Sequence, residues 1–159
     1  MKTIILFASI AIASGLLLTN IYTSLIDARS WGSDIPHSIA TARDYFKTVN
    51  PGNFFRIFSP VNQLLGILVL VLFWKTAPAI RIQLGIALLM YLVAEGLTFS
   101  YFYPRNDIMF KTAALTDVEL LKKTWSQWNS MNWVRTAVLL IGIIFSFLSL
   151  HKWYSLQLK

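Results

Sequence analysis

Residues 82–103 have the sequence IQLGIALLMYLVAEGLTFSYFY, and this stretch decides the fold. Its only charged residue is Glu95. A helix needs about 20 mostly apolar residues to cross a hydrocarbon layer roughly 30 Å thick, and this stretch meets that length. It is therefore predicted to be a transmembrane helix that ends at Pro104, because proline disrupts a helix interior.

Three other stretches have the same apolar character and cover residues 3–26, 57–74 and 131–150. Overall, 56% of the chain is hydrophobic and only 13% is charged, whereas a soluble domain usually carries about 25% charged residues. The first stretch is longer than the apolar part of a signal peptide, so it is predicted to remain as a helix. The chain is thus predicted to be one all-α membrane domain over residues 1–159, a bundle of four transmembrane helices.

The connections between the four stretches predict the topology. Only a few residues join the second stretch to the third, which makes these two antiparallel neighbours. Basic residues without acidic partners lie on the side of this short loop, namely Lys2, Lys75, Arg81, Lys152 and Lys159. Because positively charged flanks stay in the cytoplasm, both termini are predicted to be cytoplasmic, in the inner (plasma) membrane of a bacterium.

The two long connections are predicted to lie on the opposite, outer side. Residues 38–49 place apolar side chains at helical spacing, which predicts a short amphipathic helix in the first outer loop. These side chains are Ile39, Ala42, Tyr45, Phe46 and Val49. In the second connection, Thr116 and Glu119 have the spacing of a capping box. The fourth helix is therefore predicted to begin near Asp117 and to project beyond the membrane.

Two charged residues are predicted to lie inside the bundle. Glu95 and Arg135 are at similar depths from the outer ends of their helices. A lone charge in hydrocarbon is costly, so the two side chains are predicted to pair. The pair either fixes helix packing or orients a ligand and moves protons as a catalytic site. His37, in the first outer loop, is the other candidate for proton transfer near neutral pH.

Further polar side chains from the other helices lie at a similar depth. They include Asn20, Asn62, Trp128 and Asn132. Each of them alone is more simply explained as a group that joins two helices by a hydrogen bond. Their convergence at one level predicts a ligand-binding polar cavity that opens to the outer side or to the membrane.

Several classes of site find no support in the sequence. The chain has no cysteine, which excludes disulfides and thiolate chemistry. His37 and His151 lie on opposite sides of the predicted bundle, so no metal site is predicted. No phosphate-binding or catalytic signature is present, and no motif indicates which cofactor, if any, the protein uses. The basic residues form no patch with interleaved aromatics, so no nucleic-acid partner is predicted.

Two short motifs resemble a known family. Pro104-Arg105-Asn106 follows the third stretch, and Trp128-x-x-x-Asn132-x-x-Arg135 opens the fourth. They are similar to motifs of the DUF1772 group, four-helix membrane proteins that include anthrone oxygenase-like members. The resemblance covers about the last third of the chain. It implies an oxygenase-like activity on flat polycyclic phenolics in some members, and it adds Asn106 as a site position without defining its role.

Two functions are compatible with these observations. In the first, the protein binds a small lipophilic, aromatic molecule in the polar cavity, as an oxygenase-like oxidoreductase would. In the second, it is a non-enzymatic membrane module that binds lipid or a partner protein, with a homo-oligomer among the options. The polar residues then only hold the helices together.

Overall fold

The computed structural model describes residues 1–111 and 117–158, and all regular structure in these two ranges is helical. In chain order the elements are α1 (Lys2–Tyr22), the π-helical turn η1 (Thr23–Asp27), α2 (Ala28–Trp31), α3 (His37–Tyr45), α4 (Pro51–Leu72), α5 (Pro78–Leu97), the π-helical turn η2 (Thr98–Phe102), α6 (Tyr103–Phe110) and α7 (Val118–Gln157). Four helical rods are long and apolar enough to cross a membrane: Lys2–Trp31, Pro51–Leu72, Pro78–Phe110 and Val118–Gln157. The predicted all-α bundle is confirmed, and the chain is an integral membrane protein.

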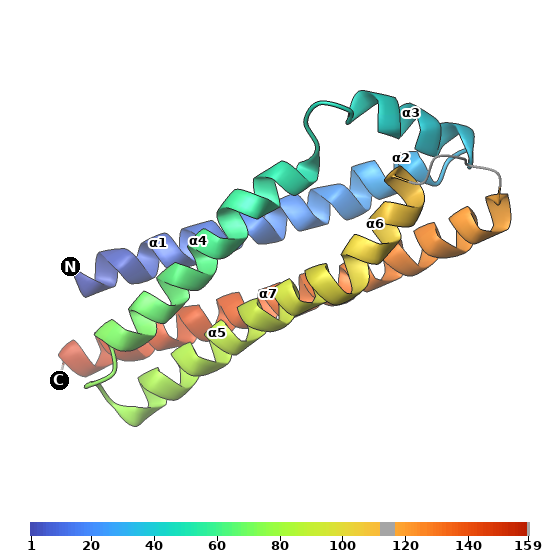
Figure 1. The fold of residues 1–159 in the computed structure, drawn as a ribbon. Coiled ribbons are helices and arrows are strands. Elements are labelled where there is room, and N and C mark those ends of the chain that lie inside the picture. The colour runs from blue at the N-terminus through green and yellow to red at the C-terminus, as the bar shows by residue number, and fades with distance from the viewer. Residues whose placement is uncertain (112–116, 159) are drawn as a thin grey trace.

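The four rods form a ring in which α1 and α5 each contact both α4 and α7. Both termini and the loop between α4 and α5 lie at one end of the bundle, which we call the terminal end (Figure 1). Helices α2, α3 and α6 lie at the other end, which we call the loop end (Figure 1). The rods run alongside one another, and α4, the shortest, begins part of the way between the two ends (Figure 1).

Each end has its own buried cluster. At the terminal end, Leu6, Phe73 and Ile80 are completely buried and join α1, the end of α4 and α5. At the loop end the cluster is richer in aromatic rings, because Trp31 and Phe102 pack edge-on against Trp128 at 5.2 and 5.3 Å between ring centroids. Apolar packing thus holds the rods together at both ends of the bundle, and the buried polar residues described below lie between these two clusters.

The third rod does not end at Pro104, which corrects the sequence prediction. It continues to Phe110, with Pro104 in the first turn of α6. The π turn η2 lies directly before α6 and interrupts the α-helical hydrogen bonds there. Proline is tolerated in the first turn of a helix because no N–H is needed there.

The second rod begins earlier than predicted. Its first residue is Pro51, preceded by an Asn50 cap whose side chain accepts from the Gly52 N–H at 2.9 Å. The Asn53 side chain accepts from the Asn50 N–H in return, at 3.0 Å. Pro60 consequently lies inside α4 and leaves the carbonyl of residue 56 without its usual helical donor.

The amphipathic helix of the first outer loop is present as α3, but it is shorter than predicted. Ile39 and Ala42 are buried against the loop-end cluster. Tyr45 and Val49 are 80% and 65% exposed, because α3 ends at Tyr45. Arg43 ties α3 to α6 by donating from Nε to the carbonyl oxygen of Met109 at 2.8 Å, and partial burial lowers its pKa.

The fourth rod is continuous, as predicted, from Val118 through the membrane to Gln157. Its cap is Asp117, whose side chain accepts from the Leu120 N–H at 2.9 Å. Thr116, the predicted capping residue, lies outside the described residues. At 1.5 Å per residue a helix of this length extends well beyond a 30 Å hydrocarbon layer.

Candidate functional site

Two asparagines join α1 to α7 by binding each other's backbone. Asn20 Nδ2 donates to the Asn132 carbonyl oxygen at 3.2 Å and to Thr136 Oγ1 at 2.6 Å. Asn132 Nδ2 donates to the Asn20 carbonyl oxygen at 3.2 Å and to Ser24 Oγ at 2.6 Å. Both asparagines have no exposed surface. This reciprocal pair fixes the two helices against each other at the polar level.

Arg135 extends this network towards α5 and α4. Its Nη2 donates to Asn132 Oδ1 at 2.6 Å, and its Nη1 donates to Thr98 Oγ1 at 3.3 Å. The guanidinium carbon lies 4.0 Å from the centroid of the Phe102 ring and 5.4 Å from that of Phe55. Because an aromatic face attracts a cation, the two rings stabilise a charge that is only 7% exposed.

The predicted direct ion pair between Glu95 and Arg135 is not formed. Among the described residues, no salt bridge joins the two side chains, and Arg135 is held by neutral oxygens instead. Both residues nevertheless line one small pocket and attract each other across it. Glu95 and Arg135 therefore lie at a common depth, as predicted, whereas the prediction of a direct ion pair between them was wrong.

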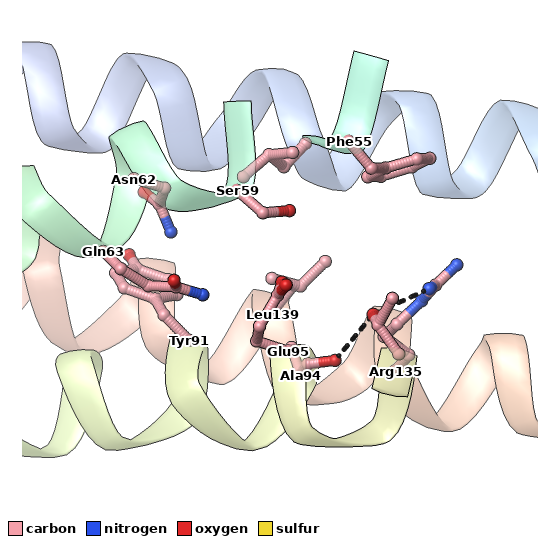
Figure 2. Close-up of a pocket in the computed structure, with 11 residues that line it drawn as sticks. Phe55, Ser59, Asn62, Gln63, Tyr91, Ala94, Glu95, Arg135 and Leu139 are labelled. Atoms are coloured by element: carbon pink, nitrogen blue, oxygen red, sulfur yellow. Dashed lines mark hydrogen bonds between the residues drawn. The ribbon is translucent and has the colours of Figure 1, made fainter. Parts of the chain in front are cut away.

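This inner pocket lies between α4, α5 and α7. It has a volume of about 20 Å³, which is room for a single water molecule. Its polar lining consists of Ser59, Asn62, Gln63, Glu95, Thr98 and Arg135. Figure 2 shows Ser59 and Asn62 reaching from α4 towards the side of Glu95 and Arg135. Its dashed lines mark the hydrogen bond that Thr98 Oγ1 donates to the Ala94 carbonyl oxygen and the one that it accepts from Arg135 Nη1. Polar groups of three helices thus meet here.

A larger outer pocket of about 250 Å³ adjoins it. The two pockets share Phe55, Ser59, Glu95 and Thr98 as lining residues, and we call them together the α4–α5 crevice. The outer part is completed by Arg56, Pro60, Phe99 and Tyr103. Phe99 is 58% exposed on the apolar flank of the rod. The crevice therefore opens sideways towards the surrounding lipid, with its most polar part at the inner end.

Both π turns carry residues of this polar level. η1 contains Thr23 and Ser24, and Ser24 accepts from Asn132. η2 contains Thr98, which accepts from Arg135, and Phe102, which lies against the guanidinium. Single π turns within α-helices are frequent at functional sites. Here they coincide with the level of the crevice on two separate rods.

The other predicted site residues are distributed unevenly. Asn62 is buried and lines the inner pocket, where its Oδ1 has no partner among the described residues. Trp128 lines neither pocket, since it packs in the loop-end cluster and donates from Nε1 to Asn106 Oδ1 at 2.8 Å. His37 is exposed at the start of α3 and also lies outside the crevice. The site therefore centres on Glu95 and Arg135 rather than on the loops.

Phe55 and Thr98 are among the residues of the crevice that the sequence analysis did not identify. Thr98 follows Glu95 by three positions, so helical spacing already places it on the same face. Phe55 precedes residue 57, the predicted start of the second span, so hydropathy places it in the first outer connection. No group of three or more potential metal ligands lies together in residues 1–111 and 117–158.

No family model, no curated protein sequence and no solved structure matches this chain. The fold and the crevice define an integral membrane protein with a partly polar pocket between α4 and α5. Any more specific function has to be argued from the geometry of that site.

Proposed function

We propose that this protein binds a small lipophilic, aromatic molecule that enters the α4–α5 crevice from the membrane. The observation that carries the proposal is the position of the crevice, which lies beside the exposed Phe99 on the flank of the bundle and becomes polar at its inner end. In the predicted orientation, with cytoplasmic termini in a bacterial inner membrane, the crevice lies in the outer half of the bilayer.

The lining supports this ligand chemistry. Phe55, Phe99 and Tyr103 offer aromatic surface to a flat apolar body in the outer part. At the inner end, Arg135 supplies N–H donors and Glu95 supplies an acceptor. Ligand sites commonly combine an apolar lining with a few polar groups that set orientation. A volume of about 250 Å³ limits the ligand to a small molecule or to one end of a longer one.

Glu95 is the residue best placed to move a proton to or from a bound molecule. It borders both pockets and is only partly buried, so a ligand can reach it. His37 is outside the crevice and is not needed for this role. The oxygenase-like activity implied by the DUF1772 resemblance stays a prediction.

A co-purification experiment with matched variants tests the proposal. Ser59→Trp fills the crevice that Ser59 lines, whereas Val61→Trp adds the same side chain to α4 at a position that lines neither pocket. The full chain is purified in mild detergent, and bound small molecules are extracted and identified by mass spectrometry. We expect a lipophilic molecule with the wild type and Val61→Trp, and its loss with Ser59→Trp. Equal amounts in all three proteins would contradict binding in the crevice.

One observation favours the alternative, a non-enzymatic module with structural polar residues. Asn20 and Asn132 line neither pocket, and they make three hydrogen bonds of 2.6 Å, with Thr136, Ser24 and Arg135. If Ser59→Trp leaves both the bound molecules and the stability unchanged, this alternative explains the polar level.

A further inference from the structure

The terminal end carries positive charge without any acidic residue. Residues 1–26, 45–94 and 120–159 contain no Asp or Glu, so no acidic side chain lies along the rods towards this end. The basic residues here come from three separate places, with Lys2 at the start of α1, Lys75 and Arg81 around the α4–α5 loop, and Lys152 near the end of α7. Figure 1 shows these segments gathered at one end of the bundle. We call Lys2, Lys75, Arg81 and Lys152 the basic rim.

Two members of the basic rim are held in place by aromatic rings. Lys2 Nζ lies 3.8 Å from the centroid of a Trp153 ring and 5.2 Å from that of Phe73. These contacts join the start of α1 to the ends of α4 and α7. The Arg81 guanidinium carbon lies 5.7 Å from the centroid of the Trp74 ring, and Arg81 Nη1 donates to the Trp74 carbonyl oxygen at 3.2 Å. The ordering of both side chains before any ligand arrives lowers the entropic cost of binding.

The other two members, Lys75 and Lys152, are exposed. Among the described residues, neither forms a salt bridge. The loop end is different, since Lys111 pairs with Asp107 at 2.7 Å and Lys122 pairs with Glu119 at 3.2 Å. Lys75 and Lys152 therefore lack the carboxylate partners that Lys111 and Lys122 have at the loop end.

Exposed apolar side chains flank each part of the basic rim. Ile4 follows Lys2, Trp74 precedes Lys75, Ile82 follows Arg81 and Tyr154 lies two residues after Lys152. An inorganic anion would make no favourable contact with these apolar side chains. A phospholipid places its charged headgroup beside the basic side chains and its acyl chains along the apolar flanks. Clusters of basic residues next to transmembrane helices attract anionic lipids in this way.

We propose that the basic rim binds the headgroups of anionic phospholipids in the leaflet at the terminal end. This inference is independent of the ligand in the α4–α5 crevice, because it uses no residue of that site. It is also independent of which side of the membrane the terminal end occupies.

The test compares two lipids with identical acyl chains, phosphatidylglycerol and phosphatidylcholine, added to the purified full chain in detergent. Lipid retention is counted by native mass spectrometry, and the thermal unfolding midpoint is followed against lipid concentration. Lys75→Gln with Lys152→Gln removes two exposed charges of the basic rim. Lys47→Gln with Lys123→Gln removes two exposed charges at the loop end and is the matched control.

We expect phosphatidylglycerol to raise the midpoint of the wild type more than phosphatidylcholine does. Each charge removed from the basic rim should weaken the apparent affinity for phosphatidylglycerol about fivefold, and the control should stay within about twofold of the wild type. Equal shifts with both lipids would overturn the proposal, as would an equal loss in the control. An equal shift with inorganic phosphate alone would overturn the commitment to a lipid.

Discussion

Replacing Asn132 by leucine should destabilise the bundle much more than the same change at Asn20, although both side chains are fully buried in one interface. Asn132 accepts from the charged guanidinium of Arg135 at 2.6 Å, in addition to donating one hydrogen bond to α1 and one to η1. Asn20 donates two hydrogen bonds to α7, but its Oδ1 has no partner among the described residues. The two substitutions therefore differ mainly by one charged hydrogen bond.

The magnitude follows from these contacts. A neutral hydrogen bond between membrane helices contributes about 0.6 kcal/mol on average, so the two bonds of Asn20 are worth about 1 kcal/mol together. A hydrogen bond to a charged group contributes about 1.5–3 kcal/mol, and its loss leaves a buried cation less well solvated. Asn132→Leu should thus cost about 1.5–3 kcal/mol more than Asn20→Leu.

The free energy of unfolding can be measured by steric trapping in lipid bicelles, with wild type and both variants under the same conditions. Arg135→Met combined with Asn132→Leu supplies the internal control, since removal of the cation should recover part of the cost of Asn132→Leu. Equal costs for the two single variants would refute the reasoning. So would a double variant whose cost is the sum of its parts.

Three more predictions follow from particular contacts. A Cβ added at Gly142 would lie 2.6 Å from Tyr91 Cε1, so Gly142→Ala should lower the free energy of unfolding in bicelles by about 1–3 kcal/mol. Gly85 has open space around the new Cβ, so Gly85→Ala should raise the same free energy by up to about 1 kcal/mol. Asp117→Ala removes the side-chain cap of α7 and should lower the unfolding free energy by about 1 kcal/mol, while Thr41→Ala, at an exposed position of α3, should change it by less than half of that. Accessibility tags at the C-terminus and between Lys75 and Arg81 should report the cytoplasmic side, and a tag beside Asp34 should report the opposite side; tags at the two termini that report different sides would contradict the bundle.

Hydropathy was sufficient to predict the four rods, because a membrane leaves a helix as the simplest way to satisfy every backbone group. It was insufficient at Pro104, where the π turn η2 moves the proline into a tolerated position. It also missed the true start of α4. Asn50 and Pro51 precede the apolar stretch, although asparagine at a cap and proline at the first position typify a helix start.

The candidate site shows a different limit of sequence reasoning. Depth along a helix can be counted in residues, so Glu95 and Arg135 were correctly assigned to one level. Which groups touch at that level depends on rotation about each helix axis and on side-chain rotamers. Arg135 donates to Asn132, three residues earlier on its own helix, and to Thr98 on the neighbouring rod. These local acceptors satisfy the guanidinium without the direct pair.

The two π turns are the places where a membrane-spanning rod of this chain can lose one residue and keep the register of its flanking helices. Each turn holds one residue more than an α-helix needs to connect the same flanks. Deleting a lipid-facing residue inside a turn, such as Leu25 in η1 or Phe99 in η2, should relax it to an α-helix and keep both flanks in register. A deletion elsewhere in a rod would rotate everything beyond it by about 100° and turn polar side chains towards lipid. Homologous chains of different length are accordingly expected to differ by one residue within these turns.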